Sequence, residues 1–104
     1  MARTTYIIKC QSAAAAMQTA EKILREEKFD YILENGQNVW KNGNAAWASM
    51  RYIRLIPVDN TTLHIEGWVK GTVGGEMNLD GIFGGLPKKM AAKVIQRIRA
   101  AIEG

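Results

Sequence analysis

The dipeptide Asn35-Gly36 constrains the fold of this chain more than any other local feature. It separates two short runs, 31–34 and 37–41, that contain β-branched and aromatic side chains. Asn-Gly favours a type I′ turn because both central residues of that turn need a positive φ. The sequence therefore predicts a β-hairpin with a two-residue loop, which fixes the register of its strands. The predicted cross-strand pairs are Ile32 with Val39 and Tyr31 with Trp40.

Three further segments are predicted to be strands because β-branched and aromatic residues are frequent in them. They are 4–10, 50–56 and 62–70. Pro57 is predicted to end the second of them, since proline cannot donate a backbone hydrogen bond. In the first segment, Tyr6, Ile8 and Cys10 are expected on one face, so Cys10 is predicted to be a core residue without a catalytic or redox role.

Two segments show the spacing of an amphipathic helix. Ser12 is a suitable N-cap for a helix that runs to about Lys28. Pro87 suits the first turn of the second helix, because the N–H that proline lacks would have no intrahelical partner there. The predicted apolar stripes are Ala13, Ala16, Met17, Ala20, Ile23 and Leu24 in the first helix, and Ala91, Val94, Ile95, Ile98, Ala101 and Ile102 in the second.

The order strand, helix, four strands, helix predicts an α+β fold, β-α-β-β-β-β-α. We expect a single curved antiparallel sheet packed against two helices. With 104 residues, 47% of them hydrophobic, the chain is predicted to form one domain over 1–104.

This order of elements resembles the half-repeat of the TATA-binding protein and related helix-grip folds. The chain also resembles small bacterial domains that have no assigned activity. The segments that carry the second resemblance are Val39 to Gly43, Trp68 with the glycines after it, Gly75 to Gly81, and Leu86 to Lys89. Both resemblances imply a fold and leave the chemistry open.

Composition excludes several classes of protein. A single cysteine rules out an internal disulfide framework, and no apolar run approaches the roughly 18 residues of a membrane span. The first residues lack the pattern of a secretory signal, so we expect a cytoplasmic protein. The net charge of +4 permits contact with nucleic acid but is also common in proteins that bind none.

The residues needed for catalysis or metal binding are scarce. The chain has one histidine, one cysteine and two serines, none of them in a recognisable nucleophile motif. His64 and Glu66 are expected on the same strand face, but a surface histidine is the simpler interpretation. A zinc site needs three or four ligands. We therefore predict no enzyme activity, no catalytic residue, no cofactor and no metal.

Six glycines lie between Gly71 and Gly85, directly before the second helix. Backbone amides at a helix N-terminus bind anions, so Gly84, Gly85, Lys88 and Lys89 form a candidate anion-binding site. The interpretation we prefer is that the glycines only let the connection cross the sheet edge, where Ile82, Phe83 and Leu86 pack. Both lysines are then expected to be solvated.

Two hypotheses for function follow. The first is an interaction module that associates with itself or with another protein through an open sheet face on which Trp68 is exposed. The second is a nucleic-acid-binding domain that uses Trp68, His64 and Lys70 together with Arg51 and Arg54, or uses the basic second helix. Against it, strand alternation predicts that Arg51 and Arg54 lie on opposite faces of their strand. The candidate surface comprises Trp47, His64, Glu66, Trp68 and Lys70.

Overall fold

The computed structural model describes residues 3–43, 50–70, 76–79 and 85–104. It confirms the α+β class, with a curved antiparallel sheet and two helices. The elements are β1 (Thr4–Lys9), α1 (Ala13–Glu26), β2 (Asp30–Glu34), β3 (Gln37–Asn42), β4 (Met50–Asp59), β5 (Thr62–Lys70), β6 (Glu76–Met77) and α2 (Gly85–Glu103).

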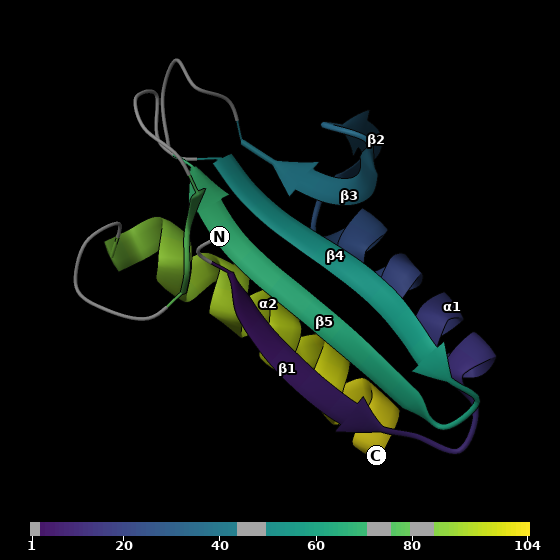
Figure 1. Cartoon of the computed structure of the whole chain (residues 1–104). Coiled ribbons are helices and arrows are strands. Elements are labelled where there is room, and N and C mark those ends of the chain that lie inside the picture. The colour runs from purple at the N-terminus through teal and green to yellow at the C-terminus, as the bar shows by residue number, and fades with distance from the viewer. Residues whose placement is uncertain (1–2, 44–49, 71–75, 80–84) are drawn as a thin grey trace.

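Strand β5 pairs with three other strands, β1, β4 and β6. The strand order is β1-β5-β4-β3-β2, and the short strand β6 pairs with β5 at Val69 and Lys70, past the end of β1 (Figure 1). Strand β6 is an addition to the predicted order, which had only five strands. A strand of two residues is too short to show an alternation of apolar and polar side chains, so the sequence does not predict it.

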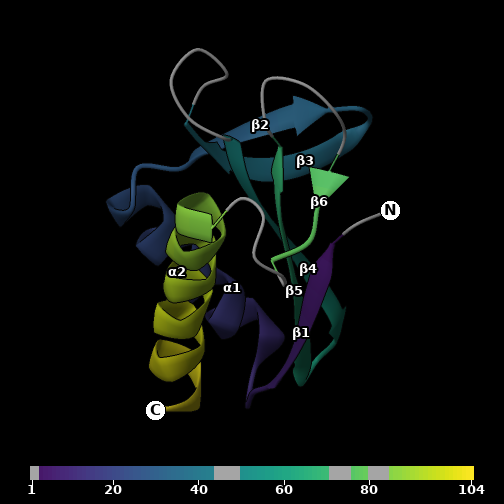
Figure 2. The ribbon, with the colours of Figure 1, turned by 90° about the vertical axis from the view of Figure 1, so that its left-hand side faces the viewer.

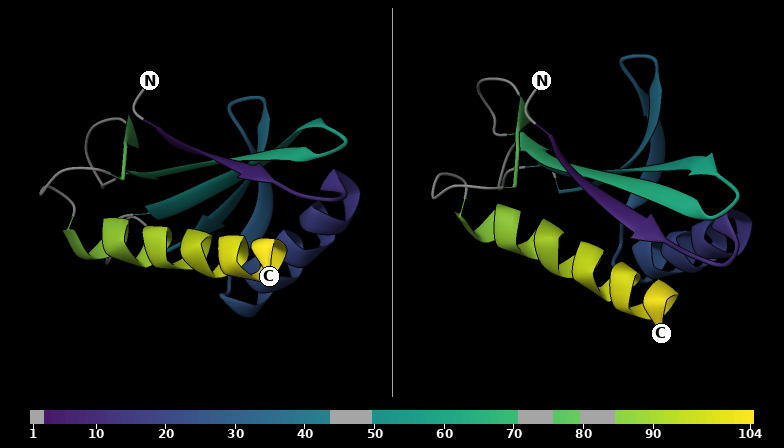
Figure 3. Two further views of the ribbon diagram at one scale, coloured as in Figure 1. Left: turned by 90° about the horizontal axis from the view of Figure 1, so that it is seen from below. Right: turned by 60° about the horizontal axis from the view of Figure 1, so that its bottom comes forward.

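Both helices lie on the same face of the sheet, here called the inner face (Figures 2 and 3). They bury their apolar stripes against alternate residues of β1, β4 and β5. The main core comprises Ile8, Ala16, Ala20, Ile23, Leu24, Phe29, Trp40, Ile53, Leu63, Ile65, Val69, Leu79, Ala91, Val94, Ile95 and Ile98. The opposite face, here called the outer face, carries no helix among the described residues.

Gly67 allows α2 to approach the sheet closely. A Cβ atom at this position would lie 2.7 Å from Cδ1 of Leu79 and 2.8 Å from Cδ1 of Ile95. Both distances are shorter than real carbon contacts, so the Leu79 and Ile95 side chains would have to shift to make room for a larger residue.

Helix α1 begins as predicted and ends slightly earlier. Ser12 is its N-cap, and its hydroxyl oxygen accepts a hydrogen bond from the Ala15 N–H at 3.2 Å. The last helical residue is Glu26, whereas the sequence predicted about Lys28. Lys28 has a φ of 68°, in the left-handed region in which chains often leave a helix.

The hairpin prediction is confirmed in both turn and register. Asn35 and Gly36 have φ angles of 52° and 76°, as a type I′ turn requires. The predicted pairs are present, and the rings of Tyr31 and Trp40 lie 4.9 Å apart between centroids. Trp40 belongs to the main core, so the hairpin is joined to the rest of the domain at this residue.

The prediction that Pro57 ends its strand is wrong. Strand β4 continues to Asp59, and Pro57 pairs with Leu63 before an irregularity in the register. Strand β3 pairs with β4 only as far as Ile53, so among the described residues the later part of β4 has β5 as its sole strand partner. A residue without an N–H is tolerated at such a free edge.

Helix α2 starts at Gly85, which places Pro87 in its first turn as predicted. Four members of its predicted stripe are buried, but Ala101 is exposed and Ile102 is only partly buried.

Cys10 is also only partly buried, although it packs against the main core beside Tyr6, as predicted. In the described part of the chain, neither helix has the length and apolar character needed to cross a membrane.

Replacement of Gly36 by Val should lower the free energy of unfolding by more than about 1 kcal/mol, because a β-branched residue resists a positive φ. No atom lies within 4 Å of the space that a Cβ would occupy, so the loss would come from the backbone alone. Denaturant titration measures it. Asn at position 36 is the control and should cost less, because Asn tolerates this region. A midpoint for the Val variant equal to that of the wild type would contradict the turn assignment.

Candidate functional site

Strand β5 places four residues of the candidate surface on the outer face. The alternation His64, Glu66, Trp68, Lys70 points away from the helices, because Leu63, Ile65 and Val69 belong to the main core. Strand pairing sets Trp68 opposite Tyr52 and Glu66 opposite Arg54. Trp47, the fifth predicted residue, lies outside the described residues.

The expectation that Trp68 is exposed is wrong. Its exposed fraction is 2%, and it stacks on Tyr52 with 5.3 Å between ring centroids and an interplanar angle of 1°. Val39 is buried in the same group, with Ile32 and Met50 packed at its margin. We call these five residues the outer cluster, which is a second, smaller core on the face without helices.

Arg3 closes one side of the outer cluster. Its guanidinium carbon lies 3.7 Å from the centroid of the Trp68 ring, within the range of a cation–π interaction. The same group donates two bonds of 2.9 Å to the Glu76 carboxylate and one of 2.9 Å to Glu66. Hydrogen bonding from Arg3 lowers the pKa of Glu76, and Glu76 in turn raises the pKa of Arg3.

The β2–β3 hairpin covers another side of the outer cluster. Its turn projects over the outer face (Figure 2), and Asn35 lines a cavity of about 170 Å³ together with Arg3 and Trp68. Tyr52 is consequently buried, and burial is the main cause that raises its pKa. The part of the outer face near the hairpin is therefore closed.

Further along the sheet, the outer face is open. Ile7 of β1 and Ile56 of β4 flank His64, because both pair with it across the sheet. The exposed fractions of Ile7 and of the neighbouring Val58 are 58% and 52%, while Ile56 and His64 are partly exposed. We call Ile7, Ile56, Val58 and His64 the open patch.

Charged residues of opposite sign border the open patch. Lys9 and Asp59 both pair with Thr62, on its two sides, two residues along β5 from His64. The Lys9 ammonium donates to the Thr62 hydroxyl at 3.1 Å. A hydrogen bond from the Thr61 backbone N–H is the main cause that lowers the pKa of Asp59, so this residue is an anion at neutral pH. The border is basic on β1 and acidic on β4.

The surface predicted for nucleic-acid binding is not brought together on one face. Arg54 lies on the outer face, 3.4 Å from a carboxylate oxygen of Glu66, whereas Arg51 lies in a cavity that α2 lines on the inner side. On α2, Arg97 pairs with two glutamates and Arg99 pairs with Glu103. Trp68 is too buried to stack on a base.

The start of α2 differs from its predicted character. Gly84 and most of the glycine stretch lie outside the described residues, so its packing and anion-binding interpretations are both untested there. Gly85 is the first residue of α2, and Lys89 is exposed as expected. Lys88 is buried, with 6% exposed, so the expectation that it is solvated is wrong. Residue 88 is one turn before Ala91 and shares its apolar stripe.

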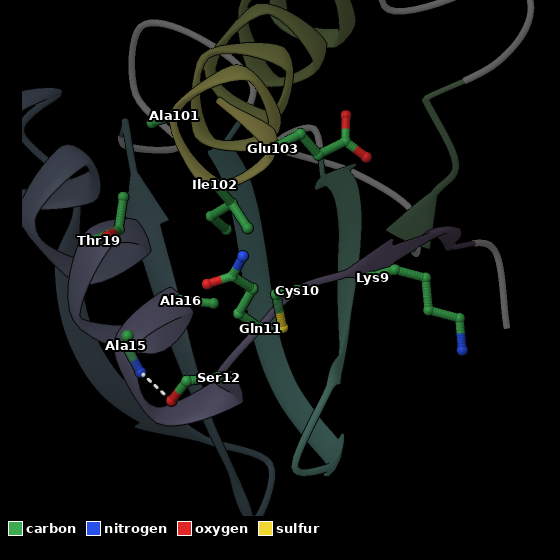
Figure 4. Close-up of a pocket in the computed structure, with 10 residues that line it drawn as sticks. All are labelled: Lys9, Cys10, Gln11, Ser12, Ala15, Ala16, Thr19, Ala101, Ile102 and Glu103. Atoms are coloured by element: carbon green, nitrogen blue, oxygen red, sulfur yellow. Dashed lines mark hydrogen bonds between the residues drawn. The ribbon is translucent and has the colours of Figure 1, made fainter.

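A cavity of about 720 Å³ lies between the end of β1, the start of α1 and the end of α2, and Figure 4 shows the residues that line it. It contains Cys10, Gln11 and Ser12, whose hydroxyl is engaged as the helix cap. Lys9 points away from the other side chains of this cavity. His64, the sole histidine of the sequence, is on the other face of the sheet, so the Cys10 thiol has no histidine base nearby.

Among the described residues, no three His, Cys, Asp or Glu side chains are grouped closely enough to hold a metal ion. Comparison with known proteins gave no match to a family model, a curated protein or a solved structure. The resemblance to small bacterial domains and to the TATA-binding protein half-repeat therefore stays a prediction.

Replacement of Arg3 by Met should lower the free energy of unfolding by about 1–3 kcal/mol at pH 7, because it removes the guanidinium partner of the partly buried Glu76 and leaves Glu66 with only the longer contact to Arg54. Arg3 lowers the pKa of Glu76 in the folded state, so its pairing stabilises the fold above the ordinary value of 4.5 and is lost as the pH falls below it. The difference between variant and wild type should therefore shrink toward about pH 3.

Chemical denaturation at both pH values tests this account of Arg3. Arg54→Met is the matched control, because Arg54 makes only one longer contact to Glu66. This replacement should lower the free energy of unfolding by about 1 kcal/mol or less. If the cost of Arg3→Met were the same at both pH values, the ion pairs would not be its cause.

The two neighbouring lysines of α2 should respond differently to the same substitution. Lys88→Glu should lower the melting temperature by several degrees, because it puts a carboxylate where a buried lysine now lies. Lys89→Glu should leave it unchanged or raise it slightly, since Lys89 is exposed near the positive end of the helix dipole. Thermal unfolding of both variants tests this difference. Equal melting temperatures would show that Lys88 is not buried.

Proposed function

We propose that this chain is a small, non-catalytic interaction module that forms a homodimer by stacking two copies of the open patch. One observation carries the proposal. Both helices cover the inner face, while Ile7 on the outer face and Val58, at the register irregularity of β4, remain more than half exposed. Contiguous exposed apolar side chains on a sheet face are typical of a contact surface.

A second copy suits this patch because its charges are self-complementary. A two-fold axis parallel to the strands would lay β1 of each copy over β4 of the other. Ile7 would then meet Ile56, and Lys9 would meet Asp59, because each pair shares one level of the sheet. Stacked sheets pack about 10 Å apart, a separation at which these side chains interdigitate.

The other exposed apolar site is less suited to a symmetric contact. Tyr31 and Leu33 are exposed on β2, which is an edge strand. Antiparallel pairing of two β2 strands about Ile32 would set Asp30 opposite Glu34 of the other copy. Like charges directly opposite each other destabilise strand pairing, so this edge opposes self-association.

The proposal predicts that Ile7→Lys abolishes the dimer while the fold remains intact. Light scattering over a protein concentration series, at about 0.1 M and about 1 M salt, measures the mass. The wild-type dimer should persist at high salt because apolar burial holds it. Leu33→Lys is the matched control, since Leu33 is even more exposed, at 71%, and lies outside the patch.

A charge exchange tests the orientation of the two copies. Lys9→Glu should weaken dimerisation by about 2- to 10-fold, and adding Asp59→Lys should restore it. A wild-type protein that is monomeric at every concentration would overturn the proposal, as would a dimer broken by Leu33→Lys but not by Ile7→Lys. Salt-sensitive binding of an oligonucleotide by that monomer would support the nucleic-acid hypothesis instead.

A further inference from the structure

A cavity on the inner side of the domain is separate from the proposed dimer surface. It lies where the end of α1 meets α2 and the paired ends of β3 and β4, and its volume is about 710 Å³. Small-molecule sites commonly measure about 300–1,000 Å³. The cavity is therefore large enough for a ligand of moderate size.

One wall of this cavity is apolar. Phe29 and Val94 are buried and belong to the main core, so they form a fixed surface. Met90 completes the wall with 41% of its area exposed. An exposed methionine beside an apolar pocket adapts its shape to a ligand.

The rest of the lining is predominantly cationic. Lys28, Arg51, Lys93 and Arg97 line it together with Glu27. The charge of Arg97 is already matched, because its guanidinium lies 2.7 Å from the Glu27 carboxylate and also pairs with Glu26. Lys28, Arg51 and Lys93 form no ion pair with any residue of the described ranges. The cavity thus has an excess of positive charge next to an apolar wall.

Arg51 is held in place by a chain of hydrogen bonds. The Asn42 amide nitrogen donates to the carbonyl oxygen of Lys28 at 2.8 Å and to that of Glu27 at 3.3 Å, and the Asn42 amide oxygen accepts from the Arg51 guanidinium. The positive φ of Lys28 is part of the backbone turn that presents these carbonyls. Burial lowers the pKa of Arg51, which indicates incomplete hydration of its charge.

We propose that this cavity binds a small amphiphile with one anionic head group and an unbranched apolar tail. Arg51 would bind the head, because its planar N–H donors match a carboxylate or a phosphate in two-point contact. Lys28 and Lys93 add positive charge around the head. The tail would lie along Phe29, Val94 and Met90, where it removes apolar surface from water.

Isothermal titration of the full chain with decanoate, decyl phosphate and decanol, below their aggregation limits, tests this proposal. At least one of the two anions should bind with one-to-one stoichiometry and raise the melting temperature. The tighter of them identifies the head group. Decanol, which has the same tail without the charge, should bind at least about 10-fold more weakly.

Two arginines of the same strand provide matched variants. Arg51→Gln should weaken binding of the anion at least about 10-fold, whereas Arg54→Gln, on the outer face, should leave it unchanged. Lys93→Gln should weaken binding less and serves as a second variant if Arg51→Gln fails to fold. Absence of saturable binding by either anion, equal binding of decanol, or equal effects of the Arg51 and Arg54 variants would each overturn the proposal.

Discussion

A sheet has two faces, and the two helices of this chain cover only one of them. Both helices need an apolar surface to bury their own stripes, and the inner face of β1, β4 and β5 supplies it. Gly67 strengthens this arrangement because it lets α2 approach closely. The outer face must therefore be covered by other segments or remain exposed to solvent. One part of it is covered and another is exposed.

The closed part depends on contacts between segments that are distant in the sequence. The β2–β3 hairpin brings Val39 onto Tyr52 and Trp68, and Arg3 lies over the Trp68 ring while it pairs with Glu66 and Glu76. These contacts convert the aromatic surface into a second core. The open part begins two residues from Glu66 along β5, where His64 lies between Ile7 and Ile56. The proposed dimer surface is thus the portion of the face that neither Arg3 nor the hairpin reaches.

The sequence predicts the parts of this fold that local physical chemistry decides. The turn at Asn35-Gly36 requires positive φ, the Ser12 cap needs only the next helical turn, and β5 alternates along its whole length. The burial of Trp68 was not predictable in the same way, because Arg3 and the hairpin cover it from far along the chain. The prediction that Lys88 is solvated is wrong for a related reason. Its charge suggested solvent, whereas its position one turn before Ala91 places it on the buried stripe. The residues that line the cavity around Arg51 come from the segment after α1, from α2 and from two strands, so no single sequence motif predicts it.

The proposed contact between two copies through the open patch can be measured directly. Amide and methyl NMR spectra recorded over a dilution series measure this contact residue by residue. Signals of Ile7, Ile56, Val58 and His64 should shift with protein concentration, while those of Trp68 and of the exposed residues of α2 should not. Spectra that are identical at every concentration, or shifts confined to β2, would contradict it.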